Sequence, residues 1–268
     1  VNLAYEAATA DLNDVNMIDP FHLETYGITT VNYNRDVEIF PVLSAIFERI
    51  YGESPYKSPT DMGVNIAGNC IIDDAICQEA SRQEIIRRYY DALNKLADDR
   101  TNEQEVFKIE MIMSQAKITK EYRKVVKAAL DLAEEEGAPA AAIELLDGRI
   151  EYGKTSALLG PCAAMILNAL KALAHIDHKV HLISPLAIEP IQDLKTTYLG
   201  SKNPRLHVDE ILIALSISAA TDQNAKLALE QLPLLQGAQV HCSSRLAAID
   251  IGTLKKLGLQ VTMEPTFS

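Results

Sequence analysis

The sequence predicts an α/β fold of the α+β kind, in which a helical region comes first and a three-layer α/β sandwich follows. Apolar residues return at helical spacing from residue 73 to 136. Strands and helices alternate after Pro139, as in layered α/β domains. The Asp147-Gly148 turn signal introduces antiparallel strands, so we expect a mixed sheet, deaminase-like in outline.

Composition sets the domain count and excludes several classes of protein. The 268 residues fit one large or two ordinary domains, and we predict a boundary near Gly137–Pro139, with residues 1–138 before it and 139–268 after it. A formal net charge of -12 disfavours binding to nucleic acid and to anionic lipid. Apolar stretches such as Ile211–Ile217 fall short of the roughly 18 residues that a membrane span needs. Four scattered cysteines do not make a disulfide framework, so we expect a cytoplasmic protein.

The first 65 residues are acidic and irregular. They hold ten acidic and three basic side chains, a net charge of -7. We expect short helices near Leu3–Leu12 and Val37–Ile50, with loops around the four prolines of this stretch. A segment of this kind persists where it packs on other elements or builds a site.

Three helices are predicted between residues 73 and 136. The first carries an apolar series from Ile76 to Leu93, and a capping box of Thr101 and Gln104 begins the second. The third covers Val125–Ala133 and ends at Gly137.

The remaining residues predict alternating strands and helices. We expect strands at 140–146, 149–152, 180–183, 239–242 and 259–263. We expect helices at 161–173, after the cap Ser184-Pro185, and at 206–219, 224–235 and 250–257.

One string matches the phosphate-loop pattern G-x-x-x-x-G-K-[ST]. It runs from Gly148 to Thr155, between a predicted strand and a predicted helix. Its interior, Arg-Ile-Glu-Tyr, alternates like a strand, whereas a phosphate loop favours small residues. We therefore favour a β-hairpin over a nucleotide loop, and both interpretations stay open.

Two further motifs resemble metal sites incompletely. Pro161-Cys162 matches the first half of a P-C-x-x-C zinc signature, but Met165 replaces the second cysteine, so zinc is not expected. Cys162 has either a lowered thiol pKa at a helix N-terminus or a buried packing role. His175, His178 and His181 are closely spaced, yet the helix ending there prevents a regular spacing of three ligands.

The acidic N-terminal loops are the predicted site. Asp and Asn residues stand beside turn formers there, where the backbone holds their side chains in place. Carboxylates that converge with a basic group can bind Mg²⁺ or transfer protons, whereas Asx residues also simply cap helices and turns. The candidate catalytic residues are Asp19, His22, Asp36 and Asp61, and the three aspartates are also the candidate metal ligands. The candidate substrate-binding residues are Asn34, Arg35, Lys57, Thr60 and Asn65.

Several long strings carry a family resemblance. They are Asn2–Leu12, Val15–Leu23, Val31–Asp36, Pro55–Asn65 and Tyr198–Leu206. Through them the chain resembles the bacterial family called domain of unknown function eighteen forty-six, whose members are about twice as long. The resemblance implies that this chain corresponds to their C-terminal half, which agrees with a start at Val1 without methionine. It also implies that a Gly-rich, phosphate-loop-like segment belongs to the upstream half.

Two functional hypotheses follow. In the first, the chain is half of a phosphate- or nucleotide-handling enzyme, and its acidic loops complete a site with an upstream half of the same protein, with Mg²⁺ and a small phosphorylated ligand as possible occupants. In the second, the chain is a non-catalytic module for binding or self-association on a degenerate enzyme fold, as a homo-oligomer. The first hypothesis requires Asp19, Asp36 and Asp61 to lie within about 10 Å of one another, close enough to share an ion.

Overall fold

The structure is a computed structural model that describes residues 17–18, 30–31, 33–54, 74–99 and 103–266. The chain forms two compact units, which divide between Tyr122 and Arg123. We call residues 1–122 the helical unit and residues 123–266 the α/β unit. The sequence placed the boundary near Gly137–Pro139, after the third helix. In the structure this helix, α6 (Lys124–Glu136), packs on the strands of the α/β unit.

The helical unit contains three described α-helices that contact one another. They are α3 (Tyr33–Tyr51), α4 (Asp74–Asp98) and α5 (Glu103–Gln115), followed by the 3₁₀ turn η4 (Lys120–Tyr122). Strands β1 (Met17–Ile18) and β2 (Thr30–Val31) form a small antiparallel pair. The helix predicted at 37–50 and the three helices predicted between residues 73 and 136 are confirmed. The helix predicted at 3–12 lies outside the described residues.

Buried charges in α4 are paired. Glu84 is 2% exposed, and its carboxylate oxygens lie 2.6 Å from Arg87 Nη2 and 3.0 Å from Arg88 Nε. Buried ions are tolerated when a partner satisfies them, so this cluster fixes one face of α4 toward the core of its unit.

The α/β unit, which is described from end to end, is built on a four-stranded sheet in the order β4-β3-β5-β6. The strands are β3 (Ala140–Glu144), β4 (Ile150–Lys154), β5 (Gln239–Cys242) and β6 (Gln260–Met263). β3 pairs antiparallel with both β4 and β5, and β5 pairs parallel with β6. The predicted mixed sheet is confirmed.

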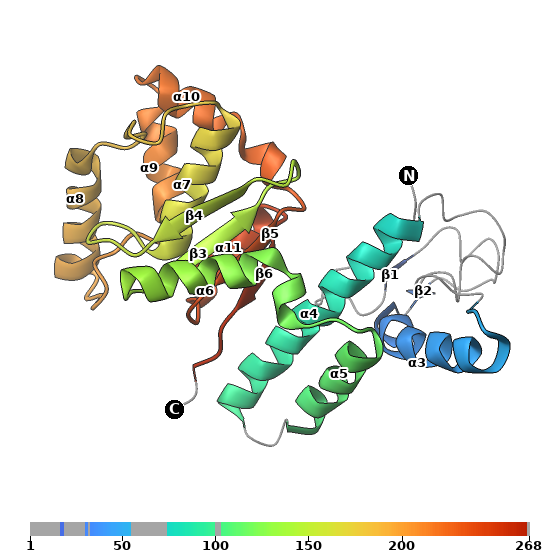
Figure 1. Ribbon diagram of the computed structural model, residues 1–268. Helices are drawn as coiled ribbons and strands as arrows, with labels where there is room; N and C mark the ends of the chain where they lie inside the picture. The colour runs from blue at the N-terminus through green and yellow to red at the C-terminus, as the bar shows by residue number, and fades with distance from the viewer. Residues whose placement is uncertain (1–16, 19–29, 32, 55–73, 100–102, 267–268) are drawn as a thin grey trace. The chain divides into compact units, whose positions relative to one another are not determined.

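The sheet lies between two layers of helices, with α6 on one face and further helices on the other (Figure 1). Ala142 packs with Val125 and Ala129 of α6 on one face. Ala141 and Ile143 belong to the larger core on the other face. Small alanine side chains let helices approach both sides of this central strand.

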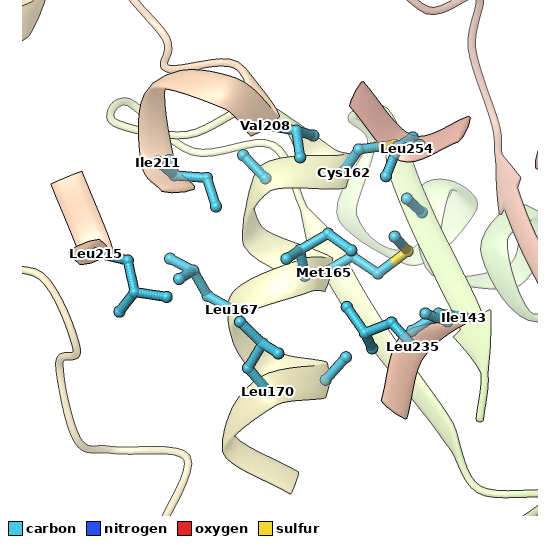
Figure 2. Close-up of a cluster of buried hydrophobic side chains, with 14 of the residues drawn as sticks. Ile143, Cys162, Met165, Leu167, Leu170, Val208, Ile211, Leu215, Leu235 and Leu254 are labelled. Carbon is cyan, nitrogen blue, oxygen red and sulfur yellow. The ribbon is translucent and has the colours of Figure 1, made fainter. Parts of the chain in front are cut away.

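The larger core is centred on α7 (Pro161–Leu173). Figure 2 shows Met165 and Leu170 of α7 among side chains of the sheet and of neighbouring helices. These neighbours are α9 (Val208–Ser218), α10 (Gln223–Leu229), the 3₁₀ turn η6 (Leu232–Leu235) and α11 (Ala248–Lys256). The predicted helix at 161–173 has the observed bounds.

The hairpin between β3 and β4 confirms the preferred interpretation of the phosphate-loop string, with a longer loop than predicted. Gly148 N donates to Leu145 O at 2.9 Å, and Leu145 N donates to Arg149 O at 2.8 Å. Gly148 has a positive φ of 83°, whereas the φ of Asp147 is not positive. A two-residue type I′ turn needs positive φ at both central positions, so the chain instead forms a type I turn closed by a glycine bulge.

Two other predictions differ from the structure. Residues 180–183 form bends in place of a strand, because Val180 N donates to Asp177 O and closes a turn. The predicted helix 224–235 divides into α10 and η6, where Pro233 begins a new turn. The helix α8 (Pro185–Asp193) begins after Ser184 as predicted, and it continues into a π-helical turn, η5 (Leu194–Tyr198).

The described helices of at least 18 residues are α3 and α4. Neither is apolar enough over its length to cross a bilayer.

Candidate functional site

A cavity of about 240 Å³ lies beside α7 in the α/β unit. Its walls come from α7, from residues 156–159 and from residues 180–188. Leu167, Leu182 and Ile188 give it an apolar lining, whereas Asn168, Lys171 and His181 add polar groups. An apolar pocket with a few polar groups is the usual form of a small-molecule site.

Lys171 is the unusual residue of this cavity. It is 8% exposed, and its Nζ donates a hydrogen bond to His178 O at 2.8 Å. Burial lowers the pKa of Lys171 below its ordinary value, and the charges of Asp177 and Glu151 oppose that effect. A buried amine with a perturbed pKa beside a cavity is a functional candidate.

Hydrogen bonds fix the loop that forms the second wall. Ser156 Oγ accepts from Leu158 N at 3.2 Å and from Leu159 N at 3.0 Å. Arg205 Nε donates to Ser156 O at 2.7 Å. These hydrogen bonds order the loop without a ligand. Binding would therefore cost less conformational entropy.

The histidine cluster does not converge. His178 Nε2 lies 3.6 Å from Glu151 Oε2, and Asp177 Oδ1 accepts from the backbone of Lys179 at 2.8 Å. Among the residues that the structure describes, no three His, Cys, Asp or Glu side chains are arranged to hold a metal ion.

The side chains of the phosphate-loop string have structural partners. Lys154 Nζ donates to Glu136 Oε1 at 2.9 Å, and Thr155 Oγ1 donates to Pro139 O at 2.6 Å. Both side chains link the end of β4 to the segment around Pro139, so their hydrogen bonds have a structural role.

Lys154→Ala is expected to leave nucleotide affinity unchanged, because the hairpin offers Lys154 no phosphate contact to lose. Isothermal titration with ATP and Mg²⁺ on both proteins measures this, with the far-ultraviolet spectrum as the folding control. A tenfold loss, about 1.4 kcal/mol, would show that the string binds phosphate after all.

Cys162 packs in the core. It is 2% exposed, and its thiol pKa is raised well above the ordinary value by a hydrogen bond to Cys242 and by burial. A lowered thiol pKa at the start of α7 is therefore wrong, and the packing alternative is confirmed.

The predicted site in the acidic loops falls largely outside the described residues. Asp19, His22, Lys57, Thr60, Asp61 and Asn65 lie there. Asn34, Arg35 and Asp36 lie in the first turn of α3, of which the structure describes the backbone. Their assignment stays a prediction.

Sequence reasoning missed the cavity beside α7. The signal that could have found it is Lys171, the one charged residue in the mostly apolar α7. A lysine at such a position is seldom buried without a specific role.

The fold and cavity define a class: a helical unit joined to a mixed-sheet α/β unit with a small-molecule-sized pocket. Two family models, described as domain of unknown function DUF1846, N-terminal and C-terminal, match residues 1–117 and 121–268. The chain belongs to this family. The resemblance inferred from the sequence is confirmed, while its restriction to a C-terminal half is incomplete, because the N-terminal model also matches.

Curated relatives also match the whole length of this chain. The chain is 58% identical over 270 residues to a UPF0371 protein of Corynebacterium glutamicum (strain R). It is 57% identical over 267 residues to UPF0371 protein DIP2346 of Corynebacterium diphtheriae and 55% identical over 267 to UPF0371 protein SUB1165 of Streptococcus uberis. Each match covers 100% of this chain and 54% of the relative, so the chain spans about half the length of these relatives.

Proposed function

We propose that the chain is part of a phosphate- or nucleotide-handling enzyme and that the cavity beside α7 binds a small ligand with an anionic group. The observation that carries this proposal is Lys171, a buried amine on the wall of an apolar cavity.

An ammonium group has three N–H donors, and Lys171 uses one of them on His178 O. An anionic group in the cavity would accept from the others and compensate the cost of burying the charge. The apolar walls would hold the ligand body, and Asn168 and His181 offer further polar contacts. This arrangement supports a ligand that joins an apolar or ring-like body to a phosphate or carboxylate.

We propose that the acidic loops supply the catalytic and metal-binding side chains of the same enzyme. Asp19, Asp36 and Asp61 would hold Mg²⁺ or transfer protons together with His22. Asn34, Arg35, Lys57, Thr60 and Asn65 would orient the substrate. The 54% coverage of the relatives is compatible with a site shared with a further part of the family chain.

Lys171→Met is expected to weaken binding of the anionic ligand at least tenfold, because it removes the cation and keeps most of the apolar volume. A thermal-shift screen of nucleotides, sugar phosphates and inorganic phosphate, with and without Mg²⁺, identifies the ligand, and titration gives its affinity. Lys179→Met is the matched control, since this exposed lysine lies on the neighbouring segment.

The pH dependence gives a second readout. The ammonium form binds the anion, so affinity is present below the pKa of Lys171 and falls as pH rises through it. Because burial lowers this pKa, the loss sets in below the ordinary value of 10.5. Equal affinity of Lys171→Met and the parent protein, or a pH profile unchanged by the substitution, would exclude this site.

A second candidate function is self-association through the α/β unit. Ile213 and Ile217 lie one helical turn apart on α9 and are exposed, as are Leu186, Tyr198 and Leu199. Exposed apolar side chains in such number are typical of interaction surfaces. Sedimentation at increasing concentration tests it: a mass that stays that of one chain would remove this candidate.

A further inference from the structure

One face of α7 lines the cavity and carries a basic group. The lining residues of this helix are Ala164, Leu167, Asn168 and Lys171. They stand three or four positions apart, so they share one face of the helix. Lys171 therefore belongs to the cavity wall by its position in α7 as well as by its burial.

The amine of Lys171 is buried and held in place. Its side chain is 8% exposed, and its Nζ donates to His178 O at 2.8 Å. The surrounding wall is mostly aliphatic, with Leu167, Leu182 and Ile188 among its members. Such surroundings favour the neutral form of a lysine, and a neutral lysine amine is a nucleophile. The lowered pKa of Lys171 agrees with this, because burial is its largest cause.

The size and the charges of the cavity suit a small carboxylate. Its volume of about 240 Å³ lies below the range of roughly 300–1,000 Å³ that is usual for ligand pockets, so the ligand is small. Lys171 and the imidazole of His181 are the lining side chains that can carry positive charge. A carboxylate has one negative charge, whereas a phosphate group has about two, so two basic groups match the carboxylate better.

We propose that Lys171 forms an imine with the ketone of an α-keto acid that has an apolar side chain. This inference rests on the proposed function, because it takes the anionic ligand to lie in the same cavity. In an α-keto acid the carboxylate and the ketone carbon are neighbours. The ammonium form of Lys171 would pair with the carboxylate, and after loss of a proton the same nitrogen would lie beside the ketone carbon. The aliphatic wall would hold the side chain of the ligand.

The reaction balances without an oxidant or a reductant. The amine nitrogen attacks the ketone carbon, the second C–O bond pair moves to oxygen, and that oxygen takes one proton from nitrogen. The remaining C–O bond then breaks, and hydroxide leaves with the second nitrogen proton as water. One amine and one ketone thus give one imine and one water. Proton uptake from solvent by the imine nitrogen would restore a positive charge beside the carboxylate.

The test is reductive trapping on the folded chain. The protein is incubated with α-ketoisocaproate and sodium cyanoborohydride, which reduces imines, and its peptides are mapped by mass spectrometry. We expect an adduct on Lys171 that adds the mass of the keto acid less one oxygen atom. We expect the exposed Lys179 to be labelled less by about tenfold or more, because its amine is solvated and protonated.

Two analogues of the probe separate the roles of its groups. Methyl isobutyl ketone has a methyl group in place of the carboxylate, so we expect it to label Lys171 about tenfold less. Isocaproate keeps the carboxylate and lacks the ketone, so it should protect Lys171 by competition. Lys171→Arg keeps the cation and cannot form an imine under these conditions, so it is expected to bind α-ketoisocaproate in a titration and to give no adduct at this position.

Titration separates this inference from the proposed function. If α-ketoisocaproate binds the parent protein and loses affinity in Lys171→Met, but reduction leaves Lys171 unmodified, the imine is wrong and the proposed function stands. Neither binding nor an adduct would overturn the α-keto acid, and so would equal labelling of Lys171 and Lys179. The proposed function itself fails when no anionic compound of the thermal-shift screen binds in this cavity. Because the mapping uses the parent protein, a folding defect in a variant does not affect the principal result.

Discussion

Gly153→Ala is expected to destabilise the α/β unit by about 3 kcal/mol or more. Gly153 lies in β4, where the backbone of α7 crosses it. A Cβ atom there would overlap Met165 N and Pro161 O and would lie 2.6 Å from Met165 Cα. These are backbone atoms of a helix in the centre of the core, so they cannot move aside without separating α7 from the sheet.

Urea unfolding followed by circular dichroism measures this change. Gly252→Ala is the matched control, because a Cβ at Gly252 in α11 meets nothing within 4 Å. Alanine also has the higher helix propensity, so the control variant should be as stable as the parent protein or slightly more stable. Equal midpoints for Gly153→Ala and the parent protein would mean that α7 does not pack on β4 as described.

Arg123→Met is expected to cost about 3–5 kcal/mol of unfolding free energy. Arg123 is 0% exposed at the start of α6. Its Nη2 donates to Val240 O at 2.9 Å and its Nε to Thr262 Oγ1 at 3.1 Å, while further hydrogen bonds reach Gln239 and Gln260. Methionine would remove all of these buried hydrogen bonds to β5 and β6.

Two further variants show which property of Arg123 matters for stability. Arg123→Lys keeps the charge but not the planar set of donors, so we expect a loss nearly as large. Lys124→Ala removes an exposed ion pair, Lys124 Nζ to Glu144 Oε1 at 2.8 Å, and should cost less than about 1 kcal/mol. A loss below that level for Arg123→Met would show that the arginine does not hold α6 on the sheet.

Local signals in the sequence predicted much of the α/β unit. Pro161 at the start of α7, Ser184 before α8 and Gly137 after α6 act on their own neighbours in the chain, so the sequence reveals them. The phosphate-loop string illustrates the limit of a motif. Its glycines are needed for a bulge at Gly148 and for close helix packing at Gly153, two requirements that also produce the spacing of a phosphate loop.

The rest could not be predicted because it depends on distant contacts. Residues 180–183 have strand-like composition, but they pack beside α7 and line the cavity without a partner strand. The cavity combines residues 156–159, α7 and residues 180–188, and no short pattern joins these segments. The acidic loops were predicted from residue types alone, and their geometry lies outside the described residues.

The order of the strands has a consequence for how the chain assembles. β3 pairs with β4 across a short turn, whereas its other neighbour, β5, is roughly 100 residues further along, with Ala141 opposite Cys242. Closing the short loop costs little entropy, so the hairpin and the following α7 make a local nucleus. We expect β5 and then β6 to join the sheet later, because their pairing closes a much longer loop. The central strand is thus half-paired early, and its second edge stays open to solvent until β5 pairs with it.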